Sequence, residues 1–260
     1  MRFMPLINIE EAALNAWPAP RQMLYDGWVL RFTGGNSKRV NSVNILAASK
    51  LPFGEKITFC EAVFRGQGLP VLFRLPEPFT PLELPKVLLE EGYVSFDPTL
   101  VLGREIEMGG SLPEGLKIRH QSDEEWLPVY VQITKKTMAS LVFHKAVLKG
   151  IVPKKSLIAF YMDEIPVACG MGVVSGDFLG YFSIFTETSV RRQGFAQAVM
   201  TALSRWGIEQ GATFGYLQVE RDNLPARAMY QKLGFARLYG YEYWKKIEKS
   251  QPHEANASKS

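Results

Sequence analysis

The stretch of sequence that decides the fold is Arg191-Arg192-Gln193-Gly194-Phe195-Ala196. It follows an apolar segment typical of a strand, 178–186, and opens a segment, 192–209, whose apolar residues recur at helical spacing. The N-terminus of a helix presents unpaired backbone N–H groups and a partial positive charge. Gly194 and Ala196 are too small to keep a ligand from that backbone, and the two arginines add fixed positive charge. The pattern therefore predicts a binding site for a pyrophosphate.

A second block of residues follows this turn. A strand, 213–220, contains Leu217-x-Val219, and the short helix after it carries Asn223, Ala226, Met229-Tyr230 and Gly234-Phe235. The two blocks together resemble the Gcn5-related N-acetyltransferases (GNAT). In that family the acetyl-CoA loop reads R/Q-x-x-G-x-G/A, and the next strand and helix read L-x-V, N-x-x-A and L-Y-x-x-x-G-F. Both blocks match in order, in spacing and in their strand-helix context.

The resemblance implies an α/β (α+β) fold with a mixed, mostly antiparallel twisted sheet flanked by helices. It also implies transfer of an acetyl group from acetyl-CoA to a primary amine by direct attack, without a covalent enzyme intermediate. In the family the fourth and fifth strands splay apart, and the pantetheine arm binds the edge of the fourth, where one backbone N–H faces the thioester oxygen. The residues that the resemblance places at acetyl-CoA are Ile184, Phe185, Thr186, Arg191, Arg192, Gln193, Gly194, Phe195, Ala196, Gln197, Asn223 and Tyr230.

Three residues are candidates for proton transfer. The resemblance places Tyr230 within reach of the sulfur, as the acid that protonates the departing thiolate. The alternative for Tyr230 is an aromatic side chain on the apolar face of its helix. By position, Glu187, just past the strand 178–186, is the first candidate for the general base, and Glu220, at the end of the strand 213–220, is the second; the alternative is that both are solvated carboxylates. A water chain could serve instead of either.

The chain divides by composition into two lobes and a tail. A segment rich in glycine, 104–116, predicts a boundary between a smaller α/β lobe, 1–110, and the lobe with the motifs, 111–247. Residues 248–260 lack apolar periodicity and are predicted to be disordered. The first lobe resembles the leading lobe of bacterial tandem acetyltransferases but has no R-x-x-G-x-G/A sequence, so we expect one acetyl-CoA per chain. The order of elements at 55–93 echoes the end of the second lobe, which suggests a duplication.

Composition excludes several classes of protein. The 260 residues carry a net charge of +4, too weak a bias to imply nucleic acid, and no apolar run approaches the length needed to span a membrane. The N-terminus does not resemble a secretory signal, so we expect a cytoplasmic protein. Cys60 and Cys169 are expected to be buried, and His120, His144 and His253 are not spaced to hold a metal.

The sequence leaves the amine acceptor and the oligomeric state open. A small metabolite or amino-acid amine is the first expectation for the acceptor, and a protein amino terminus or lysine is the second. Two alternatives to an enzyme are a non-catalytic sensor of acyl-CoA and an interaction scaffold without a cofactor.

Overall fold

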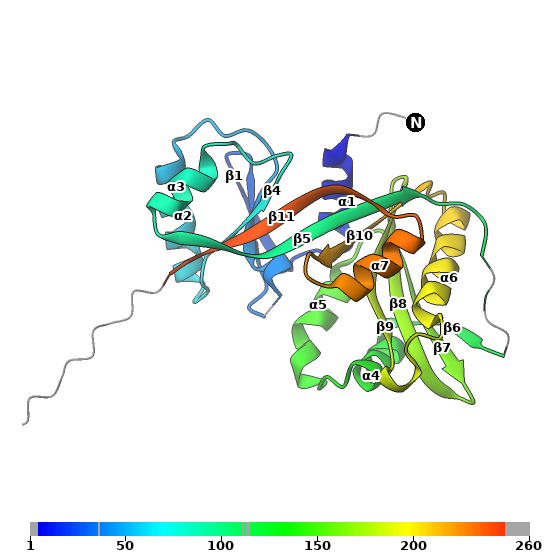
Figure 1. Ribbon diagram of the computed structural model, residues 1–260. Coiled ribbons are helices and arrows are strands. Elements are labelled where there is room, and N and C mark those ends of the chain that lie inside the picture. The colour runs from blue at the N-terminus through cyan, green and yellow to red at the C-terminus, as the bar shows by residue number, and fades with distance from the viewer. Residues whose placement is uncertain (1–4, 36, 111, 113–114, 248–260) are drawn as a thin grey trace, which may run out of the picture.

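A computed structural model describes residues 5–35, 37–110, 112 and 115–247 (Figure 1). The described helices are α1 (Leu6–Ala16), α2 (Phe53–Gly66), α3 (Leu84–Glu90), α4 (Asp123–Thr134), α5 (Val142–Gly150), α6 (Phe195–Glu209) and α7 (Leu224–Lys232), with short 3-10 turns η1 (Lys38–Val40), η2 (Ala139–Leu141) and η3 (Thr188–Val190). The strands are β1 (Arg21–Tyr25), β2 (Trp28–Phe32), β3 (Ser42–Ile45), β4 (Leu72–Pro76), β5 (Tyr93–Glu105), β6 (Lys117–Gln121), β7 (Lys154–Met162), β8 (Ile165–Ser175), β9 (Phe178–Thr186), β10 (Phe214–Glu220) and β11 (Ala236–Lys246). The predicted tail, 248–260, lies outside the described residues.

All of these strands belong to one sheet, in the order β1-β2-β3-β4-β11-β5-β10-β9-β8-β7-β6. Neighbours pair antiparallel except for β3 with β4 and β9 with β10, which are parallel. The predicted mixed, mostly antiparallel sheet flanked by helices is therefore confirmed. A hairpin turn at Asp163-Glu164 joins β7 to β8, and both residues have the positive φ that a tight hairpin turn requires.

The two halves of the chain repeat one order of elements. Three antiparallel strands, a helix, a parallel strand, a short helix and a long final strand form β1-β2-β3-α2-β4-α3-β5 and again β7-β8-β9-α6-β10-α7-β11. Gly92 and Gly234, each with φ of +82°, stand one and two residues before the final strands β5 and β11. This arrangement agrees with the duplication suggested by the sequence.

The final strands tie the halves together. β11 lies between β4 and β5 of the first half, and β5 lies between β11 and β10 of the second half. Figure 1 shows β5 and β11 as two long ribbons that cross the molecule side by side. Each half therefore completes its part of the sheet with a strand of the other. The division into 1–110 and 111–247 stays a prediction about folding units, because these strands are shared in space.

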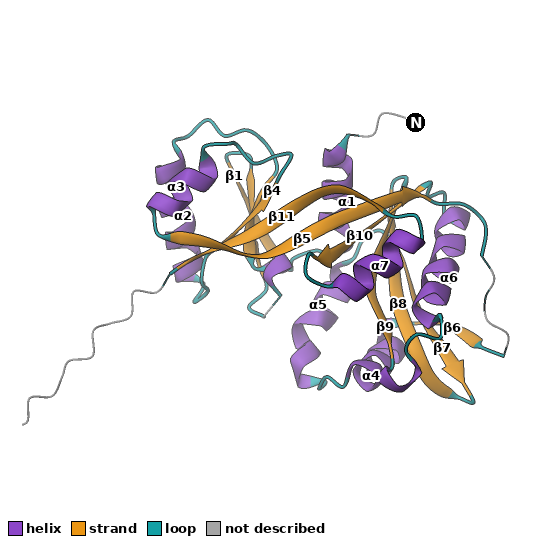
Figure 2. Cartoon of the chain, in the orientation of Figure 1, coloured by secondary structure: helices purple, strands orange, loops and turns teal. Residues whose placement is uncertain are grey.

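Helices cover the sheet of the second half on both faces (Figure 2). One core joins α1, α4 and α5, and the other joins α6 and α7; α2 and α3 pack on the first-half strands. Helix α1 comes from the first lobe in sequence but packs on β8 and β9. Its buried apolar residues, Ile9, Ala12, Ala13 and Ala16, recur at helical spacing, so one apolar stripe packs α1 against the second half.

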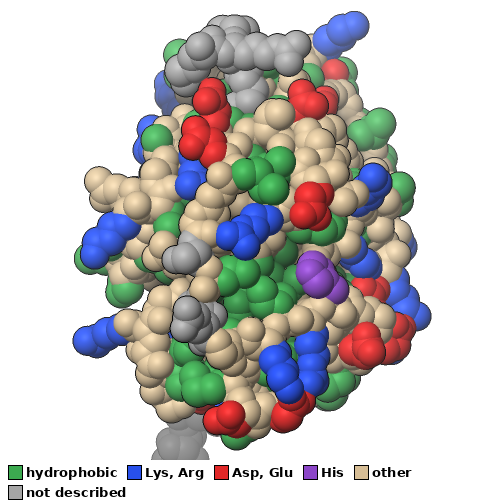
Figure 3. All heavy atoms as spheres, turned by 90° about the vertical axis from the view of Figure 1, so that its right-hand side faces the viewer, with side chains coloured by type: hydrophobic (Ala, Val, Ile, Leu, Met, Phe, Trp, Pro, Cys, Tyr) green, Lys and Arg blue, Asp and Glu red, His purple; other side chains and the backbone are tan. Residues whose placement is uncertain are grey.

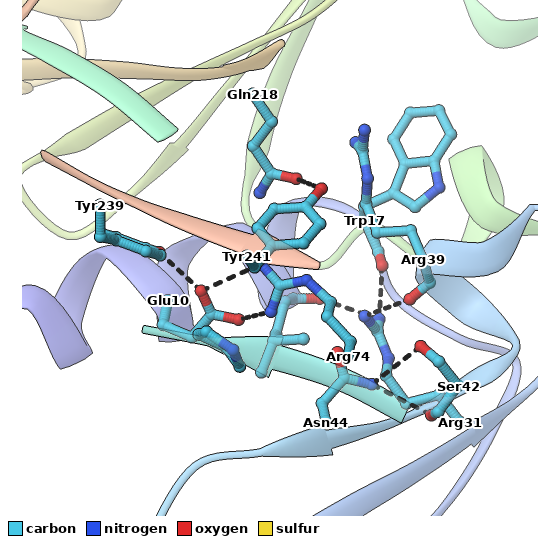
Figure 4. Close-up of polar contacts among 12 residues, drawn as sticks. Glu10, Trp17, Arg31, Arg39, Ser42, Asn44, Arg74, Gln218, Tyr239 and Tyr241 are labelled. Carbon is cyan, nitrogen blue, oxygen red and sulfur yellow. Dashed lines mark hydrogen bonds and ion pairs between the residues drawn. The ribbon is translucent and has the colours of Figure 1, made fainter. Parts of the chain in front are cut away.

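A buried polar network lies where the halves meet (Figure 4). The Glu10 carboxylate of α1 forms an ion pair with Arg74 of β4 and accepts a hydrogen bond of 2.6 Å from the Tyr239 hydroxyl of β11. Glu10 is fully buried and Arg74 is 2% exposed. Burial opposes the charge of Arg74, but the nearby carboxylate outweighs that effect and raises the pKa of Arg74 above its ordinary value. The network therefore links three elements in a fixed arrangement.

Charged side chains lie along the edge strand β6. Lys117 and Arg119 both form ion pairs with Glu164 at the β7–β8 turn. Figure 3, which looks onto the end of the molecule that holds β6, β7 and α6, shows charged side chains of both signs around a hydrophobic patch. Charged side chains at an open strand edge oppose pairing with another chain.

None of the described helices is long and apolar enough to cross a membrane.

Candidate active site

The parallel strands β9 and β10 pair for only part of their length. Their register runs from Phe178 opposite Phe214 to Tyr181 opposite Leu217, whereas β9 continues to Thr186 and β10 to Glu220. An irregularity in the β8–β9 pairing falls at this point, and Ser183 has a φ of +51°. Such bulges bend a strand away from its neighbour. The C-terminal part of β9 therefore turns an edge of backbone groups toward the space beside β10.

A cavity of about 620 Å³ begins in the space between β9 and β10. Residues Tyr181–Phe185 of β9 and Leu217–Glu220 of β10 line it, together with Asn223, Ala226 and Tyr230 around α7. Its far wall comes from η1, β5 and β11, which contribute Lys38, Arg39, Asp97, Thr99, Tyr241 and Tyr243. Both halves of the chain therefore line the cavity.

The Arg191–Ala196 turn leads from β9 into α6, as predicted. Gly194 is the N-cap of α6 with a φ of +84°, and a Cβ added there would meet nothing within 4 Å. The first helical hydrogen bond runs from the N–H of Ala198 to the carbonyl of Gly194. The N–H groups of Phe195, Ala196 and Gln197 precede it and face outward from the helix end. The turn therefore offers an open anion site with two exposed arginines beside it.

Comparison with known proteins identifies this architecture. Residues 6–244 match the protein family described as "Probable histone acetyltransferase Rv0428c C-terminal". The chain belongs to this family. It is also 26% identical over 241 residues to the "Uncharacterized N-acetyltransferase YobR" of Bacillus subtilis (strain 168), which covers 91% of this chain and 96% of that protein. The predicted membership of the GNAT acyltransferases is confirmed.

Two solved structures share the fold. A GCN5-related N-acetyltransferase from Kribbella flavida aligns with a TM-score of 0.69 at 17% identity, over 94% of this chain and 96% of that chain. A tandem GNAT protein from the clavulanic acid biosynthesis pathway aligns with a TM-score of 0.63 at 11% identity, over 93% of this chain and 87% of that chain. Both alignments include the first half of the chain, so the similarity extends over both lobes.

Tyr230 and Asn223 line the same side of the cavity, around α7. The Tyr230 ring packs edge-on against Phe235 at 6.0 Å, and burial raises its pKa to about 12. Asn223 caps α7 by accepting a hydrogen bond of 3.2 Å from the N–H of Ala226, which leaves its amide N–H₂ free to donate to a ligand. Ile184 and Phe185 of β9 line the cavity opposite these residues.

The two carboxylates proposed as bases have different surroundings. Glu187 caps η3: its carboxylate accepts hydrogen bonds from the backbone N–H and the hydroxyl of Ser189, and Lys135 lies 3.4 Å away. The Ser189 bonds, with a smaller effect of Lys135, lower the pKa of Glu187 to about 2. Glu220 is exposed at the end of β10 and lines the cavity, whereas Glu187 is outside the cavity lining.

Several residues that line the cavity are not among the site residues predicted from the sequence. Lys38, Arg39 and Asp97 come from the first lobe, and Tyr241 and Tyr243 come from β11. The alternation of Tyr239, Tyr241 and Tyr243 is a readable signal, because alternate residues of a strand point to one face. The described residues contain no group of three or more His, Cys, Asp or Glu side chains that could hold a metal ion. Cys60 and Cys169 are buried free thiols, as expected.

Proposed function

We propose that this acetyltransferase transfers the acetyl group of acetyl-CoA to the primary amine of a small acceptor by direct attack. One observation supports this most: the open edge of β9 connects the anion site at Gly194 with the cavity between the two halves. A pyrophosphate at the N-terminus of α6 and a pantetheine arm along β9 would then direct the thioester into the cavity. The cavity lies between the two halves, where sites for small molecules are common, and this position favours a small acceptor over a folded protein.

The reaction divides among a few groups of the chain. The amine nitrogen forms a bond to the thioester carbon, the carbon–sulfur bond breaks, and the nitrogen loses one proton while the sulfur gains one. A backbone N–H at the edge of Ile184–Thr186 would stabilise the negative oxygen of the tetrahedral intermediate. The Tyr230 hydroxyl would donate a hydrogen bond to the sulfur as negative charge develops, and the released thiolate would take its proton from water.

We assign proton removal from the amine to Glu220, directly or through water, rather than to Glu187. Glu220 lines the cavity, and a base must come within hydrogen-bond reach of the proton it removes. A carboxylate with a pKa of about 2, as in Glu187, is a weak proton acceptor at neutral pH, and its oxygens already hold Ser189 and Lys135. The part that Glu187 plays is to fix the turn that precedes Arg191.

The decisive experiment is release of CoA from acetyl-CoA in the presence of a panel of amines, followed by detection of the free thiol. Turnover with small amines supports the proposal, and turnover only with a lysine or amino terminus of a protein would replace it with the second acceptor class. Binding of acetyl-CoA without turnover of any amine would identify a sensor. Absence of acetyl-CoA binding would contradict the proposal altogether.

Gly194→Asp is expected to weaken acetyl-CoA binding by at least ~2 kcal/mol, about 30-fold. The variant places a negative side chain in the open space beside the N–H groups that would hold the phosphates. Asp is a favourable N-cap residue and tolerates positive φ, so the fold is retained. Calorimetric titration measures the affinity.

The matched control is Gly194→Asn, which adds a side chain of the same size and the same backbone preference without the charge. We expect Asn to weaken binding less than Asp, because charge repulsion is added only by Asp. Equal affinity of wild type and Gly194→Asp for acetyl-CoA would show that the phosphates do not bind at this turn.

One acetyl-CoA is expected per chain. In the first half, a carboxylate of the chain itself binds the turn between β3 and α2. The Asp26 carboxylate accepts hydrogen bonds of 3.0 Å from the N–H groups of Lys50 and Leu51. Lys56 of α2 lies 3.2 Å from the same carboxylate. This carboxylate thus places a negative charge beside the start of α2, where it would repel a phosphate. Calorimetry of the wild type should give a stoichiometry near one, and a stoichiometry near two would indicate a second site.

A further inference from the structure

Beyond the open edge of β9, the cavity has a wall of aromatic rings. Trp17 and Phe182 stack with their ring centroids 5.7 Å apart, and Trp17 meets His144 edge-on at 5.0 Å. The His144 ring lies 5.1 Å from that of Tyr130. All four rings line the cavity. Trp17, Phe182, His144 and Tyr130 therefore form one continuous surface, called here the aromatic wall.

A cation lies at each end of the aromatic wall. The guanidinium carbon of Arg39 is 5.6 Å from the ring centroid of Trp17 and 6.0 Å from that of Phe182. The ammonium of Lys136 is 5.5 Å from the ring centroid of Tyr130 and 3.3 Å from its hydroxyl. Arg39 and Lys136 both line the cavity, and attraction to the rings holds each cation near the wall.

These two cations have no carboxylate partner. The carboxylates of the cavity lining are Asp97, which is paired with Lys38, and Glu220. Among the residues that the structure describes, no carboxylate lies within 4.0 Å of Arg39 or Lys136. Burial, and then the charge of Lys136, lower the pKa of His144 to about 4, so its ring is neutral at pH 7. The unpaired charge of the aromatic wall is therefore positive.

The backbone of Arg39 is held in place from behind (Figure 4). Its carbonyl accepts a hydrogen bond of 3.0 Å from Arg31, which is 1% exposed. Arg31 also donates to the carbonyls of Leu14 and Trp17 at the end of α1. The buried guanidinium thus fixes η1 against α1. An anchored arginine beside a ring, with its N–H groups unpaired, is suited to bind a carboxylate through two parallel hydrogen bonds.

We propose that the acceptor is an amine that also carries a carboxylate, and that Arg39 binds this carboxylate while Lys136 adds to the positive potential. The inference rests on the proposed function, because it concerns the acceptor half of the same cavity. An apolar part of the acceptor would pack on the aromatic wall. A lysine-rich tail of a protein would instead place its positive charges beside Arg39 and Lys136, and this repulsion opposes its binding.

The test compares amino acids with the amines that lack only their carboxylate, such as phenylalanine with phenethylamine and tryptophan with tryptamine. The readout is kcat/KM for CoA release at saturating acetyl-CoA. We expect the wild type to prefer the best carboxylate-bearing amine over its partner by ~30-fold, since hydrogen bonds to charged groups are strong. Arg39→Gln should remove most of that preference, mainly through KM, and Arg39→Lys should restore part of it.

Arg191→Gln is the matched control, since it removes an arginine from the phosphate side: it should raise KM for acetyl-CoA and leave the preference ratio unchanged. Thermal unfolding of each variant checks that the fold is kept. Turnover without a carboxylate preference, or a preference that Arg39→Gln leaves intact, would overturn this inference alone. Faster acetylation of a lysine-rich peptide than of any carboxylate-bearing amine would also overturn it. Turnover of no amine at all would overturn the proposed function and this inference together.

Discussion

Glu10→Ala is expected to lower the free energy of unfolding by about 3–5 kcal/mol. The substitution leaves the Arg74 guanidinium, 2% exposed, without its carboxylate, and it removes the acceptor of the Tyr239 hydroxyl. An uncompensated charge in the interior costs far more than a lost surface pair, because water cannot reach it. Urea unfolding measures the change as a lower midpoint with an unchanged slope.

The control is Glu90→Ala, which breaks an exposed ion pair, Lys86 with Glu90, on the surface of α3. It should change stability by less than about 0.5 kcal/mol. The double variant Glu10→Leu/Arg74→Met should recover much of the stability lost in Glu10→Ala, because it removes both charges and leaves neither unpaired. If Glu10→Ala were as mild as Glu90→Ala, the network would contribute little to joining the halves.

The second half of the fold could be predicted from local patterns. The turn at Gly194, the cap at Asn223 and the hairpin at Asp163-Glu164 all depend on residues within a few positions of one another, and all are present. Apolar residues at helical spacing from Trp126 to Leu141 suggest one continuous helix, but α4 ends at Thr134, η2 follows, and α5 begins only at Val142. Lys135, with a φ of +57°, ends α4. Lysine is not a residue type that favours this left-handed conformation, so the sequence does not indicate that the helix ends there.

The joining of the halves could not be predicted in the same way. The apolar stripe of α1 is readable, but the strands that it covers lie far along the chain. The insertion of β11 between β4 and β5 depends on pairing between distant strands, for which no turn residue sets the register. For that reason the aromatic wall and Arg39 were outside the sequence-based site, whereas the cofactor side was within it.

The candidate bases illustrate the same limit at the scale of single atoms. Position at a strand end favoured Glu187 first and Glu220 second, and nothing else in the sequence separates these two carboxylates. The difference lies in what each carboxylate contacts: Glu187 holds Ser189, and Glu220 faces the cavity. These contacts depend on the path of the backbone after the strand ends, which spacing alone does not reveal.

Tyr230→Phe is expected to lower kcat by ~10²-fold, with little change in acetyl-CoA affinity, because the hydroxyl acts mainly in the transition state. The phenylalanine ring keeps the edge-on contact with Phe235, so packing is retained. The control, Tyr25→Phe, removes a hydroxyl in the first half from a ring that stacks on Phe59, and it should leave kcat unchanged. Single-turnover measurements with saturating acetyl-CoA separate the chemical step from binding.

The pH dependence of the wild type tests how Tyr230 acts. Burial raises its pKa to about 12, so the hydroxyl stays protonated well beyond pH 10 and its ionisation should cause no loss of rate below that pH. A thiol has a pKa near ~8.5, so a phenol this weakly acidic stabilises the departing thiolate by donating a hydrogen bond rather than by complete proton transfer. The ~10²-fold deficit of Tyr230→Phe should then be nearly constant from pH 7 to 10. A deficit that vanished as the pH rose would mean that Tyr230 supplies a titrating proton, and wild-type turnover in the variant would reduce its part to packing.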